Sequence, residues 1–152
     1  MKEKFLLVSL VAILLFSCDN KNKNEKSAAS KTADSLFNNV MDGHNVAMAK
    51  MGRLTRAEQA SRRLLDSIRK LPGKAKQAAE PLRIKLDTLQ KELSYAEFAM
   101  NKWMEEFNMD SALNNIEQRI DYLKSEKLKV SKVKDAILES LQKADSVLKK
   151  RF

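Results

Sequence analysis

Apolar residues recur along most of this chain at alternating spacings of four and three. The pattern is strictest in the middle, at Leu82, Leu86, Leu89, Leu93, Ala96, Met100, Trp103 and Phe107. One apolar stripe with this spacing is typical of a helix that packs against other helices. The stripe predicts a helix over 75–107. Pro81 lies near its start, either in the first turn of a helix that begins there or at a kink in one that begins near Lys74.

Two further segments have the same alternating spacing, and they predict one helix before and one helix after the helix over 75–107. The segment 33–70 has the stripe Phe37, Val40, His44, Ala47, Met51 and Leu54, which weakens at Glu58 and Ser61 and resumes at Leu65 and Ile68. The segment 111–150 has Leu113, Ile116, Ile120, Leu123, Val130, Val133, Ile137, Leu141, Ala144 and Leu148, interrupted by Lys127. Leu71-Pro72-Gly73 ends the first helix, and Asp110 or Ser111 caps the start of the last.

Short turns near Pro72-Gly73 and Asn108–Ser111 make successive helices antiparallel neighbours. We therefore expect an all-α fold: an elongated up-down-up antiparallel three-helix bundle with coiled-coil-like packing. It forms one domain over 33–152.

The N-terminal segment predicts a secretory signal peptide. A charged start precedes the apolar run Phe5–Phe16, which is shorter than the roughly 17–25 residues of a membrane-spanning helix. Leu15-Phe16-Ser17-Cys18 resembles the bacterial lipobox, with cleavage between Ser17 and Cys18 and acyl chains, palmitate among them, on Cys18. The alternatives are an ordinary cleaved signal and an uncleaved anchor. Residues 1–17 are then a lipoprotein signal peptide, and the polar segment 18–32 is a flexible tether.

The sole histidine suggests one candidate binding site. His44 shares a helix face with Met48 and Met51, with Met41 one turn before it. The antiparallel arrangement brings Met100, Trp103, Met104 and Phe107 to the same end of the bundle. Thioether and imidazole ligands suit Cu(I), and a histidine–methionine pair suits haem. The alternative is that methionine fills core gaps and the histidine is simply hydrogen-bonded.

Charge and motif content narrow the function classes. The chain has 29 basic and 20 acidic residues, a net charge of +9. Because the chain is expected to be exported and has no nucleic-acid-binding motif, we exclude nucleic acid as a partner. Anionic membrane lipid, envelope polymer or a protein remain as partners of the basic surface. The alternative is that the basic face only keeps the protein soluble. No nucleophile–base pair, glycine-rich phosphate loop or inward carboxylate pair is present, Glu58 being the one carboxylate on a stripe. We expect no enzymatic activity and no cofactor beyond the lipid on Cys18.

Three segments resemble a family of small Bacteroidota lipoproteins that carries the label "viral A-type inclusion protein". They are His44–Gly52, Ala96–Phe107 with its Trp103-Met104 pair, and Tyr122-Leu123. Acidic residues usual after the family's histidine are replaced here by Asn45 and Val46. The resemblance assigns no activity.

The resemblance does imply a lipid-anchored protein of the cell envelope, and we expect the chain to face the periplasm. The expected function is a structural or interaction module. The alternatives are a binding protein for a soft metal or for an apolar ligand such as haem at His44, Met48 and Met51, and self-association through the apolar stripes.

Overall fold

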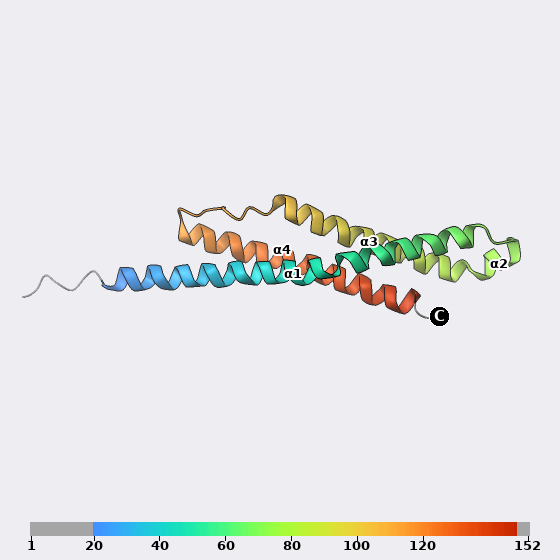
Figure 1. Cartoon of the computed structure of the whole chain (residues 1–152), viewed down its shortest axis with the longest axis horizontal. Helices are drawn as coiled ribbons and strands as arrows, with labels where there is room; N and C mark the ends of the chain where they lie inside the picture. The colour runs from blue at the N-terminus through green and yellow to red at the C-terminus, as the bar shows by residue number, and fades with distance from the viewer. Residues whose placement is uncertain (1–19, 149–152) are drawn as a thin grey trace, which may run out of the picture.

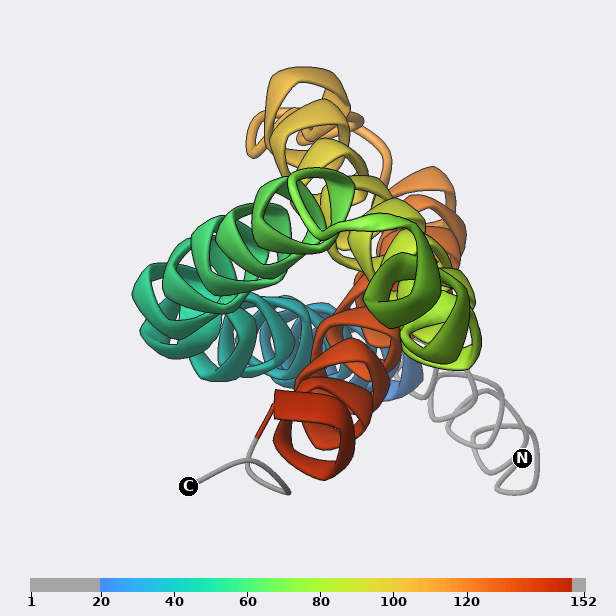
Figure 2. The same cartoon turned by 90° about the vertical axis from the view of Figure 1, so that its right-hand side faces the viewer.

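The computed structural model describes residues 20–148, and this part of the protein is all-helical. Four helices pack against one another: α1 (Asn20–Arg69), α2 (Gly73–Ala78), α3 (Glu80–Glu106) and α4 (Ile116–Leu148). In the elongated molecule of Figure 1, α3 runs opposite to both α1 and α4. The end-on view of Figure 2 shows the three long helices around a common axis. The expected all-α class is confirmed, with a fourth, short helix in addition.

The core follows the apolar stripes. Six stripe residues of α3 are buried: Leu86, Leu89, Leu93, Ala96, Met100 and Trp103. All of them except Leu86 pack with the buried stripe residues of the other two long helices, among them Val40, Ala47, Leu54, Val130, Ile137 and Leu141. A second, smaller cluster of Leu65, Ile68 and Leu86 lies towards the α2 end. Alternation of four and three therefore identified the packed face of each long helix.

Helix α1 begins earlier than expected. The sequence predicts a flexible tether over 18–32, but the backbone is helical from Asn20 and runs without a break to Arg69. Within 28–32 only Ala29 is half-buried and the other residues are exposed, so packing contributes little to this part of the extension. Extending a formed helix adds one hydrogen bond for each residue ordered, and the packed turns beyond Ala33 provide the nucleus. Lysine, the most frequent residue in this segment, is a good helix former.

Pro81 separates α2 from α3. Its ring removes one backbone donor and collides with the carbonyl four residues earlier, so one continuous helix over 75–107 is not formed. Pro81 instead lies in the first turn of α3, where the missing N–H costs nothing. Ala79 between the helices keeps a helical backbone (φ −85°, ψ −5°). The first alternative therefore describes the start of α3, and the second correctly places helical backbone from near Lys74, although the interruption at Ala79 divides it into two helices.

Helix α4 starts at Ile116, not near Ser111. Ala112 adopts a positive φ of 56°, which ends any helix there. Asn115 is the actual cap: its Oδ1 accepts a hydrogen bond from the Gln118 N–H at 3.1 Å. The preceding loop is held by α4, since Arg119 donates to the carbonyls of Met109 and Ser111 at 2.7 and 2.8 Å. The expected Asp110 or Ser111 cap is wrong.

Two glycines of α1 differ in what surrounds them, which gives a matched test of the α1–α4 contact. A Cβ on Gly43 would lie 3.2 Å from Cγ1 of buried Val130, whereas a Cβ on Gly52 would meet only the mobile end of Arg56 at 3.6 Å. We expect Gly52→Ala to raise the free energy of unfolding by about 0.5–1 kcal/mol through helix propensity. Gly43→Ala should lower it by about 1 kcal/mol, because the β-branched Val130 is stiff and cannot give way.

Urea unfolding followed by circular dichroism measures both variants. Equal stabilisation by the two substitutions would show that α1 and α4 can separate at Gly43 without loss, contrary to the close approach described above.

Candidate functional site

His44 lies half-buried on α1 against an aromatic side chain of α3. Its ring centroid is 5.6 Å from that of Trp103, with the ring planes tilted by 36°. Its Nδ1 lies 3.1 Å from Oδ1 of the neighbouring Asn45. His44 therefore lies against the last turns of α3 as expected, but it does so from the middle of α1, because α1 begins earlier than the sequence predicts. The ring that lies next to the His44 imidazole is the indole of Trp103.

The methionines of the proposed cluster occupy different environments. Met51 is half-buried and packs against the main core, and Met100 is fully buried within it. Met48 and Met104 are each 38% exposed. Among residues 20–148, no group of three or more His, Cys, Asp or Glu side chains is placed to hold a metal ion. Binding of a soft metal, haem or another apolar ligand at His44, Met48 and Met51 stays a prediction.

A ladder of aromatic rings continues from His44 across the end of the bundle. Trp103 and Phe107 stack at 4.8 Å and 19°, and Phe107 and Tyr122 at 6.2 Å and 12°. The Tyr122 hydroxyl accepts a hydrogen bond from the Asn108 N–H at 2.8 Å, which ties the loop to α4. Stacked aromatic pairs stabilise beyond their burial by about 0.5–1.5 kcal/mol each. The ladder joins α1, α3 and α4 at the end where α4 begins.

A buried carboxylate completes this end of the bundle. Glu126 of α4 is only 3% exposed, and its Oε2 accepts the indole N–H of Trp103 at 2.9 Å. Its other oxygen accepts a hydrogen bond from Lys129 at 2.8 Å. That bond raises the pKa of Lys129 above its ordinary value, against the opposing effect of burial. Each oxygen of this buried carboxylate therefore accepts one hydrogen bond, and the bond from Trp103 fixes the orientation of the indole.

Sequence reasoning missed Glu126 because it assigned the stripe position of this turn to Lys127. The structure corrects both: Lys127 is exposed, and Glu126 lies inside between Leu123 and Val130. A spacing of three and then four fits this turn as well as four and then three, so periodicity leaves two neighbours open. Trp103 could have indicated a buried acceptor such as Glu126, because a buried indole N–H needs a hydrogen-bond acceptor.

Glu58 of α1 lies where its stripe position predicts, between α1 and α3. Its Oε1 accepts hydrogen bonds from Gln90 Nε2 and Ser94 Oγ, both at 2.8 Å, and from Arg62 at 3.0 Å. Nearby, Ser61 is fully buried and its hydroxyl donates to the Leu86 carbonyl at 3.3 Å. The weak stretch of the α1 stripe is thus a polar contact between two helices.

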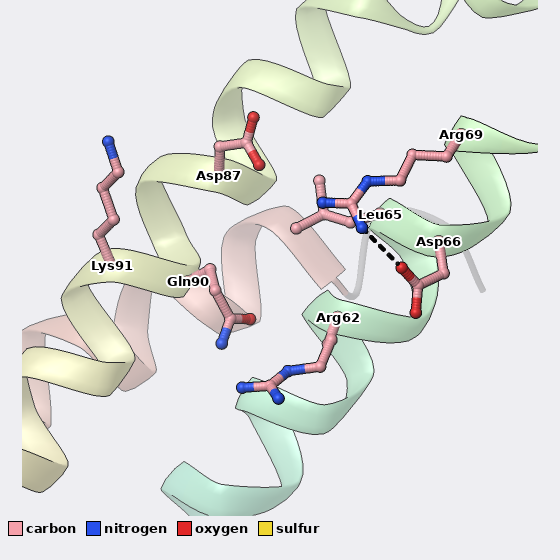
Figure 3. A pocket seen from close by; sticks show the side chains of 7 residues that line it. All are labelled: Arg62, Leu65, Asp66, Arg69, Asp87, Gln90 and Lys91. Carbon is pink, nitrogen blue, oxygen red and sulfur yellow. Dashed lines mark hydrogen bonds and ion pairs between the residues drawn. The ribbon is translucent and has the colours of Figure 1, made fainter.

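A groove of about 510 Å³ lies beside this contact, between α1 and α3. Charged side chains from both helices form its rim, and it is lined by Arg62, Leu65, Asp66, Arg69, Asp87, Gln90 and Lys91. Figure 3 shows Arg69 turned towards Asp66, with which it pairs at 3.0 Å. Oε1 of Gln90 is buried and has no partner among the described residues. Cations and carboxylates alternate on the rim, so the groove selects no single charge.

Cys18 and Ser17, the predicted lipidation and cleavage residues, lie outside the described residues. Within residues 20–148, none of the helices has the length and apolarity needed to cross a membrane. Comparisons with protein-family models, with curated proteins and with solved structures find no match for this chain. The resemblance to the Bacteroidota lipoproteins thus stays a prediction.

Proposed function

We propose that the protein is a membrane-anchored bacterial lipoprotein that acts as a structural or interaction module and catalyses no reaction. The observation that carries this proposal is the unbroken helix α1. It begins two residues after Cys18 and continues into the packed core up to Arg69. A lipid on Cys18 would therefore be joined to the bundle through a helix and not through a loose chain.

This arrangement makes the protein a rod held at one end. A helix of 50 residues is about 75 Å long. Its polar contacts between helices at Glu58 and Glu126 fix how the three long helices pack, which we propose to be an up-down-up antiparallel bundle with coiled-coil-like packing. The module stands in the cell envelope facing the periplasm, with envelope polymer or a protein as partner of its basic surface.

Acylation of Cys18 is the decisive test. In a bacterium that processes lipoproteins, the full chain should incorporate an alkyne analogue of palmitate and sediment with membranes. Cys18→Ser should lose all label and enter the soluble fraction, because the thioether cannot form. Each buried methylene contributes about 0.8 kcal/mol, so the acyl chains on Cys18 anchor the protein permanently and their loss releases it.

The matched control is Ser17→Ala, which keeps a small residue before the cleavage site and should keep both label and membrane binding. Mass spectrometry of the mature N-terminus completes the test. An unmodified Cys18 thiol, or a first mature residue other than Cys18, would contradict the proposal.

A further inference from the structure

The turn between α1 and α3 forms a basic tip at one end of the molecule. We define the basic tip as residues 69–78, which include all of α2 and contain Arg69, Lys70, Lys74 and Lys76 but no acidic residue. Every residue of the tip is exposed, and α2 buries none of its side chains. Figure 1 shows α2 at the opposite end of the molecule from the start of α1.

The positive charge of the tip is largely unneutralised. Arg69 pairs with Asp66 at 3.0 Å. Within residues 20–148, Lys70, Lys74 and Lys76 form no ion pair, although Lys76 donates to the Arg69 carbonyl at 3.4 Å. Some lysines elsewhere are paired, Lys143 for example with Glu92 across helices at 2.6 Å, while others among the described residues, such as Lys50 and Lys132, form no ion pair either. Lys70 and Lys74 therefore present their charge to solvent, and Lys76 does so close to Glu80, whose carboxylate pairs with Arg83.

An apolar side chain lies among these cations. Leu71 is 38% exposed, directly after Lys70 and three residues before Lys74. A soluble polyanion would bind the lysines and leave Leu71 in water. A bilayer surface suits both kinds of side chain, because lysines meet the lipid phosphates while an apolar residue enters the boundary with the acyl chains.

We propose that the basic tip binds the anionic head groups of a lipid bilayer, with Leu71 inserted at the acyl boundary. This goes beyond the proposed function, since it adds a membrane contact remote from the N-terminal end. Only its role as a second contact, about one α1 length from the lipid, rests on acylation of Cys18. Binding by the tip itself does not.

Vesicle binding of unlipidated protein tests the tip alone. The protein is the chain from residue 18 with Cys18→Ser, which keeps the complete core because every buried described residue lies between Ala33 and Ala144. The probe is a vesicle of phosphatidylglycerol and phosphatidylcholine, and the measurement is co-sedimentation at low and at moderate salt. We expect binding that weakens as salt screens the head groups.

The test variant carries Lys70→Gln, Lys74→Gln and Lys76→Gln. Each cation at an anionic surface contributes about fivefold, so the triple change should weaken vesicle binding on the order of 100-fold. The control carries Lys50→Gln, Lys127→Gln and Lys132→Gln, three exposed lysines outside the tip, and has the same net charge. It should change binding by less than about fivefold. Circular dichroism confirms that both variants remain helical.

Leu71→Ser distinguishes a membrane from a polymer. It should weaken vesicle binding by about threefold and leave binding to soluble polyphosphate unchanged. No vesicle binding, or equal losses in the two triple variants, would overturn the proposal. If the protein binds both vesicles and polyphosphate and Leu71→Ser weakens neither, the proposal is also overturned, and a polyanionic polymer becomes the expected partner. If palmitate fails to label Cys18 while the tip still binds vesicles, the lipoprotein proposal fails and this one stands.

Discussion

Trp103→Ala is expected to lower the free energy of unfolding by about 4 kcal/mol, because truncation of a buried tryptophan typically costs about 3–5 kcal/mol. The indole packs in the main core and contacts both His44 and Phe107. Its removal opens a cavity and takes from Glu126 its only indole donor. Domains of this kind are stable by about 5–15 kcal/mol, so the variant should be near the limit of folding.

Urea unfolding followed at 222 nm by circular dichroism measures the change, since the variant has no tryptophan left to report by fluorescence. With an m-value of about 2 kcal/mol/M, the midpoint should fall by about 2 M. A fall of less than about 0.5 M would show that α3 and α4 close the cavity and that the aromatic ladder is not a major source of stability.

Trp103→Phe separates the hydrogen bond from the packing. Phenylalanine keeps an aromatic ring in the stack but lacks the N–H, so Glu126 loses a donor at a cost of about 1–2 kcal/mol. Glu126→Leu alone leaves the indole N–H unpaired. The double variant removes both groups, and its loss should be smaller than the sum of the two single losses by about 1 kcal/mol. Additive losses would mean that the Trp103–Glu126 bond makes no net contribution.

The apolar stripes were sufficient to place the core of each long helix, because burial in a packed helix follows the 3.6-residue period. The end of α1 was also predictable, since Pro72 and Gly73 follow its last turn. The start of α1 was not, because a polar segment that continues a packed helix has no apolar stripe by which it could be recognised. The cap of α4 was overlooked at Asn115, three residues before Gln118, a spacing typical of helix starts.

The candidate site was predictable in position but not in chemistry. The antiparallel arrangement correctly brought His44 to the end of α3, yet the residue against it is Trp103, while Met48 is exposed. Side-chain direction within one turn decides this, and a stripe specifies it only to about one residue. The same uncertainty hid Glu126 behind Lys127. The basic tip was not recognised from the sequence, because its four cations stand out as a separate surface only once the structure places α2 at the far end of the molecule from the start of α1.

Leu93→Ala carries the second large expected effect and tests whether the stripe of α3 stabilises the whole bundle. Leu93 is fully buried at the centre of the main core, with 0% of its surface exposed. Replacement of a buried leucine by alanine costs about 2–5 kcal/mol through lost transfer energy and the cavity left behind. We expect about 3 kcal/mol, measured as a lower urea midpoint with an unchanged m-value.

The matched control is Ile84→Ala on the same helix, where the side chain is 54% exposed. Truncation of an exposed side chain removes few contacts and leaves no cavity, and alanine is the better helix former, so the change should stay within about 0.5 kcal/mol. Equal losses at the two positions would show that the outer face of α3 is also covered, as it would be in a self-associated form. A dependence of the Ile84→Ala loss on protein concentration would then identify a second copy of the chain as the cover, because only association makes stability depend on concentration.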